Sequence, residues 1–233
     1  MINEGFIKYG FDAIECGVPV VVTIGSFDGL HKGHRVLLDH LKAMARRLGA
    51  RSVVVTFDPH PRIAMGKDCG MGLLTTLEER ALLLREAGID NMVVAHFDDK
   101  FRSQSYDEFV EYSLVNGLGM RGMIVGYNHR LGRGSEGNYE ALVPIAERCG
   151  FALECVAQHR VDEGKVSSTV VRSAIEEGDM ERVKRLLGGD YIIAGVAAEG
   201  VIEVSDSHKL LPPSGDYSCL LYTSDAADER SSV

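Results

Sequence analysis

Two histidines three residues apart form the first group of side chains that could carry chemistry. They lie in the segment GSFDGLHKGH (25–34), which follows a short apolar run and opens a helical pattern. Residues three apart share one face of a helical turn, so His31 and His34 direct their imidazoles to the same place. The start of a helix also offers free N–H groups and the positive end of a dipole, which attract phosphate. The pattern predicts a site that stabilises charge on phosphate, and the alternative is a glycine-rich turn with two surface histidines.

A second group lies in KVSSTVVRSAIEEGD (165–179). Its apolar spacing predicts a helix that begins near Ser168 or Thr169. Ser168 and Arg172 are four residues apart, so we expect them to share the exposed side of the first turn. A capping box would need Glu or Gln three residues after the serine, where valine stands. The hydroxyls are therefore predicted to be free for a ligand, and the alternative is an ordinary helix cap.

Two loops after other apolar runs complete the candidate site. In TFDPHPR (56–62) two prolines flank a histidine, which predicts either a rigid extended loop beside a ligand or a plain turn. In VGYNHRLGRGSEG (125–137) four glycines accompany Arg130 and Arg133. A flexible, basic loop in an acidic protein suits an anion such as a phosphate, and the alternative is a solvated hairpin.

A doubly wound α/β sheet is the fold that these patterns predict. Five short apolar runs are interpreted as buried parallel strands, at 20–25, 52–57, 91–96, 122–127 and 151–156. Crossover helices are expected at 36–48, where Gly49 would end the helix, and at 77–84, 106–114 and 142–148. Ligands of such sheets bind at the carboxyl ends of the strands, beside the helix N-termini.

Composition and charge narrow the class of protein. Of the 233 residues, 45% are hydrophobic and 25% are charged, which is ordinary for a soluble fold with a substantial core. The formal charge of −9 argues against a sequence-independent grip on nucleic acid. There is no run of eighteen apolar residues and no leader-like N-terminus, so we expect a cytoplasmic protein without membrane contact. Five cysteines without a C-x-x-C pair indicate reduced thiols and no zinc site.

The four segments together resemble one family. GSFDGLHKGH resembles the H-x-G-H signature of the nucleotidylyltransferase superfamily, in the form found in bifunctional riboflavin kinase/FMN adenylyltransferases. KVSSTVVR is similar to that family's (K/R)-(I/V)-SST-x-(I/V)-R motif. In the family's VG-x-(D/N)-F-x-F-G motif, Asn128 and Gly132 keep the pattern, while His129 and Leu131 replace the usual aromatic residues. The resemblance extends over about residues 18 to 200.

This resemblance implies a Rossmann-like nucleotidylyltransferase fold and an adenylyl transfer from ATP, accompanied by Mg²⁺, to FMN, which yields FAD and pyrophosphate. It assigns catalysis to His31, His34, Ser168 and Arg172, with the arginine as a bidentate clamp on the β- and γ-phosphates. It assigns ATP binding to Gly25, Ser26, Phe27, Asp28, Gly33, Lys165, Ser167 and Thr169. It assigns flavin binding to Asp58, His60, Pro61, Asn128, Arg130 and Gly132, and it names no dedicated metal ligand.

Some alternatives stay open at this point. Asp28 could equally form an Asx turn. The chain could be another H-x-G-H transferase with a different phosphate acceptor, or an inactive remnant that only binds a flavin or a nucleotide.

The resemblance divides the chain into three parts. Residues 1–189 are interpreted as the adenylyltransferase domain, and 190–218 as a fragment of the family's C-terminal riboflavin kinase β-barrel. CLLYTSDAADE resembles a translated sequencing adapter, so residues 219–233 are interpreted as an artefactual tail. The Pro-Thr-Ala-Asn stretch that holds nucleotide phosphate and Mg²⁺ in that barrel does not occur, so we expect no phosphorylation of riboflavin. All four motifs precede Gly189, so a chain cut there is expected to keep FMN adenylylation.

Overall fold

Runs of β-branched residues form the central sheet. The computed structural model describes residues 5–14, 17–66, 70–157, 160–161, 164–198, 201–204 and 206–222. Within these residues the main sheet has six parallel strands in the order β1-β4-β3-β2-β5-β6. The strands are β1 (Ile7–Tyr9), β2 (Val20–Ile24), β3 (Arg51–Asp58), β4 (Asn91–His96), β5 (Met120–Gly126) and β6 (Ala152–Val156). The doubly wound α/β fold and all five predicted strands are confirmed, and β1 is an additional edge strand.

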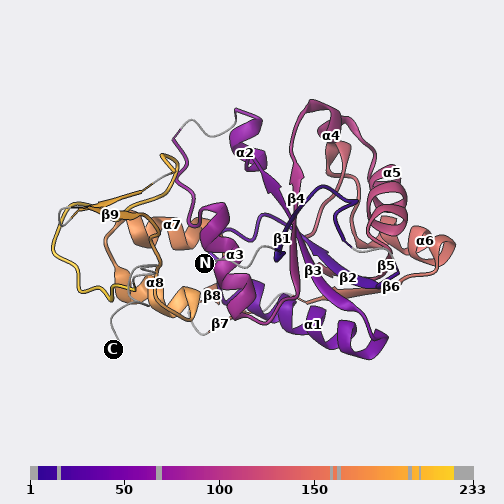
Figure 1. Cartoon of the computed structure of the whole chain (residues 1–233), viewed down its shortest axis with the longest axis horizontal. Coiled ribbons are helices and arrows are strands. Elements are labelled where there is room, and N and C mark those ends of the chain that lie inside the picture. The colour runs from indigo at the N-terminus through magenta and orange to yellow at the C-terminus, as the bar shows by residue number, and fades with distance from the viewer. Residues whose placement is uncertain are drawn as a thin grey trace, which may run out of the picture.

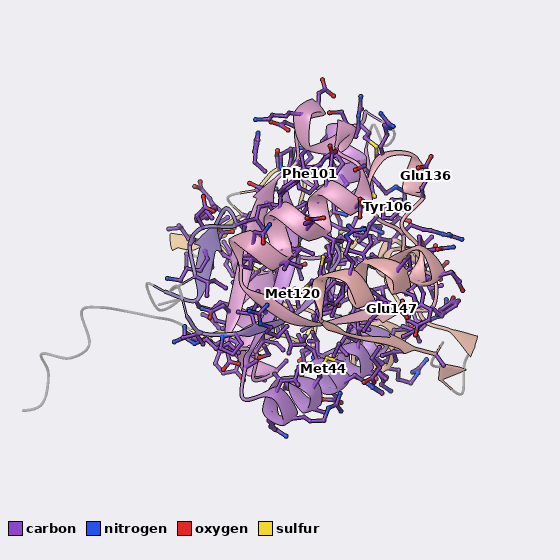
Figure 2. All side chains as sticks on the ribbon, turned by 90° about the vertical axis from the view of Figure 1, so that its right-hand side faces the viewer. Met44, Phe101, Tyr106, Met120, Glu136 and Glu147 are labelled. Carbon is purple, nitrogen blue, oxygen red and sulfur yellow. The ribbon has the colours of Figure 1, made fainter. Side chains whose placement is uncertain are left out.

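Alternate strand residues pack into two cores, one on each face of the sheet. In β2, Val20, Val22 and Ile24 belong to one core, and Val21 belongs to the other. The Val21 face is covered by α1 (Lys32–Leu48) and α3 (Leu77–Glu86). The opposite face is covered by α4 (Asp99–Ser103), α5 (Tyr106–Glu108), the π-helix η1 (Phe109–Gly117) and α6 (Tyr139–Cys149). Figure 2 looks onto this second face, with the helices in front of the strands.

Helix α1 begins at Lys32, inside the segment 25–34 that was expected to open it and four residues before its apolar spacing starts at Val36. His31 is its N-cap residue, and the His31 Nδ1 accepts a hydrogen bond from the His34 backbone N–H at 3.4 Å. Histidine is not among the residues that usually cap helices, so the sequence did not predict that His31 is the N-cap. Gly49 adopts the left-handed conformation (φ 59°) and ends the helix, as predicted.

Two further elements differ in detail from the prediction. The helix expected at 106–114 consists of α5, which carries a capping box, and then η1 with π-type hydrogen bonds. Apolar spacing cannot distinguish the two helix types over so short a stretch, because each buries residues three and four apart. The segment 56–62, predicted as an extended loop or a turn, continues β3 to Asp58 and then forms the one-turn helix α2 (Pro61–Ala64).

A third apolar core lies beside the sheet. Helices α7 (Ser168–Glu176) and α8 (Met180–Leu187) pack around the fully buried Leu74. Two small antiparallel ladders accompany them, β7 (Arg160–Val161) with β8 (Gly164–Lys165), and β9 (Val196–Ala198) with β10 (Val201–Glu203). The second ladder lies within residues 190–218, the segment interpreted as a β-barrel fragment (Figure 1). Residues 223–233 of the predicted tail lie outside the described residues.

None of the helices in the described ranges is long and apolar enough to cross a membrane. Cys149, Cys155 and Cys219 are free thiols, whereas Cys16 and Cys69 lie outside the described residues.

Candidate active site

The two histidines of the first motif form a stacked pair at the start of α1. Their ring centroids are 3.7 Å apart and the ring planes differ by 13°. Phe27 packs against the other side of His34, with 5.0 Å between ring centroids. A Cβ at Gly33 would lie 3.2 Å from the His31 ring, so glycine lets that ring lie flat against the backbone. The predicted convergence of His31 and His34 is confirmed.

Both imidazoles are uncharged at neutral pH. Burial lowers the pKa of His31 to about 4. Burial is the largest cause that lowers the pKa of His34 well below its ordinary value, and electrostatic interactions with His31 and Arg80 lower it further. Because the Nδ1 of His31 accepts a hydrogen bond, the proton of its neutral ring lies on Nε2. The His31 ring can therefore stabilise negative charge as a neutral donor.

The loop before α1 contains two residues with an unusual backbone conformation. Phe27 has φ 46° and Leu30 has φ 39°, in the left-handed region that residues other than glycine rarely occupy. Each costs about 1–3 kcal/mol relative to a relaxed residue, so the surroundings must hold it there. Both side chains are buried, at 2% and 0% exposure. Such strain is typical of functional loops.

Asp28 is the residue that fixes this loop to the rest of the protein. Its Oδ1 accepts hydrogen bonds from the Thr75 N–H at 2.9 Å and the Thr75 hydroxyl at 3.1 Å. Its Oδ2 accepts from the Leu74 N–H at 3.2 Å and from the Arg172 guanidinium. The Asp28 carboxylate is thus fully engaged and forms no Asx turn, which corrects the alternative taken from the sequence.

Arg172 and Ser168 both point at this aspartate. The Arg172 Nη2 pairs with the Asp28 carboxylate, and its Nε donates to the Gly72 carbonyl at 2.8 Å. The Ser168 hydroxyl donates to the Asp28 carbonyl at 2.9 Å. The side chain of Arg172 is only 11% exposed. The expectation that Ser168 and Arg172 share an exposed side of α7 is therefore wrong, because that turn faces the loop at Asp28.

Three further residues of the segment 165–179 were predicted to bind ATP. Ser167 is the N-cap of α7 and its hydroxyl accepts from the backbone N–H three residues later, at 3.4 Å. The prediction of free hydroxyls is wrong for Ser167, because one side-chain acceptor caps a helix without the glutamate of a capping box. Thr169 is exposed. Lys165 belongs to β8, and its side chain lies outside what the structure describes.

Arg80 is a buried cation that the sequence patterns missed. It is 3% exposed, and it donates to the Thr56 hydroxyl at 2.9 Å and to the Thr75 carbonyl at 3.3 Å. The Thr56 hydroxyl donates in turn to the Ser26 carbonyl at 3.3 Å. Burial lowers the pKa of Arg80, and the carboxylates of Asp28 and Asp58 oppose that effect. The only local signal was an arginine at an inward position of the predicted helix at 77–84.

The charges of Asp28 and Arg80 also act on the segment at the end of β3. His60 is 8% exposed and caps α2 by accepting from the Arg62 backbone N–H at 3.3 Å. Burial lowers the pKa of His60 to about 4, and the next contributions come from Asp28, which raises it, and from Arg80 and Arg172, which lower it. The charges of Asp28, Arg80 and Arg172 therefore all act on His60, and its assignment to the flavin site stays a prediction. Of its neighbours, Asp58 is exposed and Pro61 is the first residue of α2.

The loop after β5 presents two predicted flavin-binding side chains to solvent. Asn128 and Arg130 are exposed. The next residue, Leu131, is buried at 7% exposure and exchanges two backbone hydrogen bonds with Gly137, each of 3.0 Å. Leu131 thus joins the core rather than the open side of the loop. The short 3₁₀-helix η2 (Arg133–Ser135) lies between the bridged residues.

The loop after β5 packs against Tyr106. Gly132 has φ 68°, and a Cβ there would lie 2.4 Å from the Tyr106 backbone nitrogen. Only glycine tolerates both that conformation and that approach. Figure 2 shows Tyr106 beside Glu136 at this end of the molecule. Tyr106 was not among the predicted site residues, because a tyrosine in an amphipathic helix gives no sign of the loop that it meets.

Strand order explains why these segments gather. Strands β3, β2 and β5 are neighbours and run parallel, so their carboxyl ends share one edge. The chain proceeds from β2 outward to β3 in one direction and to β5 in the other, and ligands bind at such a switch point. Gly25, whose N–H donates to the Val55 carbonyl at 3.1 Å, marks this edge. Among the described residues no group of three or more His, Cys, Asp or Glu side chains could hold a metal ion.

Comparison with known proteins identifies the family. Residues 14–170 match the family model described as FAD synthetase. Over 180 residues the chain is 34% identical to a bifunctional riboflavin kinase/FMN adenylyltransferase of Haemophilus influenzae and 36% identical to one of Pseudomonas fluorescens. Each alignment covers 77% of this chain and 58% of the relative. A relative from Geobacillus thermodenitrificans is 37% identical over 169 residues, 72% of this chain and 89% of the relative.

A solved structure supports the fold. The crystal structure titled as a macrolide-efflux protein from Streptococcus pneumoniae superposes with a TM-score of 0.76 at 23% identity. The match covers 89% of this chain and 71% of that chain. Together with the match to the family model, these relatives show that the chain belongs to the FAD synthetase family.

Proposed function

We propose that this chain is an FMN adenylyltransferase, which transfers the AMP group of ATP to FMN and releases pyrophosphate. The stacked, uncharged pair of His31 and His34 at the N-terminus of α1 is the observation that supports this reaction best. It lies in a member of the FAD synthetase family, and the names of the relatives include FMN adenylyltransferase.

In the proposed reaction, a phosphate oxygen of FMN attacks the α-phosphorus of ATP in line with the leaving pyrophosphate. A new P–O bond forms to FMN, and the bond between the α-phosphorus and the bridging oxygen breaks. The FMN phosphate is already largely ionised at pH 7, so no strong general base is required. The chain's task is to position both substrates and to stabilise negative charge. The Nε2–H of His31 and the free N–H groups at the start of α1 are suited to that task.

The residues around the pair would share the binding of the two substrates. For ATP we retain Gly25, Ser26, Phe27, Asp28, Gly33, Lys165, Ser167 and Thr169 as the candidate surface, and for flavin we retain Asp58, His60, Pro61, Asn128, Arg130 and Gly132. Since both oxygens of Asp28 accept hydrogen bonds, its part is to hold the loop. Arg172 would reach a phosphate through Nη1, because its Nε and Nη2 are bonded to Gly72 and Asp28. Mg²⁺ would enter with ATP, since such ions are held largely by substrate phosphates and water.

The decisive experiment compares phosphate acceptors. The purified chain is incubated with ATP, Mg²⁺ and FMN, and both FAD and pyrophosphate are measured. We expect equal amounts of the two products, and little reaction with phosphopantetheine, nicotinate mononucleotide or glycerol phosphate. Faster reaction with one of those acceptors would assign the chain to a different transfer. Binding without any turnover would mark it as a remnant.

The chain spans about 58% of the length of the Haemophilus influenzae and Pseudomonas fluorescens relatives. We further propose that these 233 residues do not phosphorylate riboflavin, because they contain no Pro-Thr-Ala-Asn string. Formation of FMN from riboflavin and ATP would contradict this. Free cysteines without a C-x-x-C pair fit a reducing compartment, so we assign the reaction to the cytoplasm.

A further inference from the structure

A lysine far along the chain forms a fully buried ion pair with the adenylyltransferase core. The Lys209 ammonium lies 2.7 Å from the Glu79 carboxylate, and both side chains are 0% exposed. The two residues are 130 positions apart in the sequence. Glu79 belongs to α3, which begins just after Leu74 and Thr75, the residues that donate hydrogen bonds to Asp28. Lys209 follows β10, in the segment 190–218 that was interpreted as part of a separate unit.

Every hydrogen of the Lys209 ammonium has a partner. Besides Glu79, it donates to the Leu74 carbonyl at 2.7 Å and to the Ile192 carbonyl at 2.8 Å. It also lies over the Tyr191 ring, 4.2 Å from the ring centroid. Full pairing of this kind is what makes a buried charge tolerable. Three carbonyl or carboxylate acceptors therefore fix where this ammonium can be.

The pair is anchored on both sides. Glu79 Oε1 accepts from the Ala194 N–H at 2.7 Å, and Glu79 Oε2 accepts from the Thr76 N–H at 2.9 Å, which forms the capping box of α3. The backbone of the C-terminal segment also pairs with residue 73. The Leu73 N–H donates to the His208 carbonyl at 2.6 Å, and its carbonyl accepts from residue 210 at 2.8 Å. In Figure 1 the orange and yellow end of the chain accordingly returns to the side of α3 and α7.

One residue, Leu74, joins this pair to the candidate active site. The Leu74 carbonyl accepts from Lys209, and the Leu74 N–H donates to the Asp28 carboxylate. Thr75, the next residue, gives Asp28 two more hydrogen bonds. Residues 73–76, which we call the bridging loop, thus contact Lys209 on one side and the aspartate of the histidine motif on the other.

A contribution to folding stability does not by itself explain why this buried ion pair is present. Removing two charges from water costs about as much as their attraction returns, and well-packed apolar residues often replace buried pairs without loss. What a lysine supplies here, and an apolar residue cannot, is a donor to the Leu74 carbonyl. We infer that Lys209 is a positioning residue for adenylyl transfer, which holds the bridging loop so that Asp28 keeps the His31–His34 loop in place.

This inference rests on the proposed FMN adenylyltransferase activity. It also assigns residues 191–210 to the adenylylation unit, in contrast to the expectation that the first 189 residues suffice.

The test uses the full chain and three variants. Lys209→Met leaves Glu79 unpaired in the interior, so we expect it to lower the melting temperature. The double variant Glu79→Gln/Lys209→Met removes both charges, so no uncompensated charge stays buried, and it leaves the Leu74 and Ile192 carbonyls without the Lys209 donor. Lys184→Met is the matched control, because Lys184 also pairs with a carboxylate, that of Asp190 at 2.8 Å, but on the surface.

Two measurements separate positioning from general stability. In the double variant we expect the amides of Leu74 and Thr75 to exchange with solvent at least tenfold faster, while the melting temperature falls less than in Lys209→Met, because no uncompensated charge stays buried. We expect kcat for FAD formation to fall roughly 10- to 100-fold, the size of effect that small misplacements of catalytic groups cause. Lys184→Met should change neither quantity.

Parental exchange rates at both amides in the double variant would overturn the inference. If the parent chain makes FAD, a parental kcat in the double variant would overturn it as well. If the parent chain made no FAD, the proposed function would fail, whereas the exchange rates would still decide whether Lys209 holds the bridging loop.

Discussion

At the scale of single residues, His31 has two tasks that can be separated. Its Nδ1 caps α1, and its Nε2–H is the candidate donor to the reacting phosphate. Asparagine is a good N-cap, so His31→Asn should leave the melting temperature nearly unchanged. We expect its kcat for FAD formation to fall roughly 10²-fold, as when a donor to a developing oxyanion is lost. Steady-state kinetics and thermal unfolding check the two halves.

His34→Ala should lower kcat by a similar factor of roughly 10². The Michaelis constant for FMN should change little in either variant, since both imidazoles are proposed to face ATP. Near-normal turnover in both variants would remove the pair from the mechanism.

Arg172 tests whether geometry or charge matters at the centre of the site. Its guanidinium bonds to Asp28 and to the Gly72 carbonyl at once, which a lysine ammonium cannot copy in the same plane. We therefore expect Arg172→Lys to lose nearly as much kcat/KM as Arg172→Ala, at least tenfold. Arg182→Lys is the control, because Arg182 pairs with Glu177 on the surface. Recovery of most activity by lysine would make Arg172 a general positive charge.

The sequence predicted which residues of the site to examine, but not all of their partners. His31 and His34 converge because their spacing within one helical turn determines it. The bond between Asp28 and Arg172 joins residues 144 positions apart, and no local pattern carries that information. Arg80 was missed for the same reason, since its partners come from a strand and from the bridging loop.

At the scale of elements, the loop after β5 offers two glycines for comparison. Both have positive φ, but Gly132 (φ 68°, ψ −175°) lies in a region that is essentially restricted to glycine, whereas Gly134 (φ 69°, ψ 4°) lies near the left-handed region, so alanine strains the backbone more at Gly132. A Cβ at Gly132 would meet the Tyr106 backbone at 2.4 Å, whereas one at Gly134 would meet only the Glu136 side chain at 3.3 Å. We expect Gly132→Ala to raise the Michaelis constant for FMN about tenfold or more, because the loop must leave Tyr106. Gly134→Ala should change it much less.

Kinetics with each substrate varied in turn would check this assignment. An equal effect of Gly132→Ala on the Michaelis constants for ATP and FMN would mean that the loop does not serve the flavin side.

The elements themselves were largely predictable. Short apolar runs predicted five strands, and the helices predicted from apolar spacing are present, whereas α4 and α8 were not predicted. Strand β1 was missed because its three residues, Ile7–Tyr9, are too few to show a period. The capping role of His31 was missed because histidine is an uncommon N-cap residue.

At the scale of the whole molecule, buried histidines make stability depend on pH. A histidine of the unfolded chain titrates near pH 6.5. Burial lowers the pKa of His31, His60 and His129 to about 4. Between these values the unfolded chain binds more protons, so the free energy of unfolding falls as the pH drops from 6.5 toward 4. Above pH 6.5 this loss is absent.

His129 allows that effect to be measured outside the histidine pair. Burial alone lowers its pKa, and its buried Nε2 has no hydrogen-bond partner among the described residues. His129→Leu should therefore lose less stability than the parent chain between pH 7 and pH 5, by roughly 2 kcal/mol. Denaturant unfolding at the two pH values gives the comparison. Equal losses in the two proteins would contradict the assignment.

At this scale the sequence predicted the sheet and its helices. It did not predict that the C-terminal segment packs back against them. The period of the apolar residues specifies the sheet and its helices. It does not specify that residues 191–210 bind the bridging loop, because that contact depends on one lysine and a few backbone groups.

The buried pair of Lys209 and Glu79 also limits how such chains can diverge. A lineage that lost one of the two charges would leave the other uncompensated in the interior, so each loss should be followed by the second. Positions 79 and 209 are therefore expected to covary among relatives. For the same reason, recombination that exchanges everything after residue 190 should yield working chains only from donors that bring a lysine to position 209.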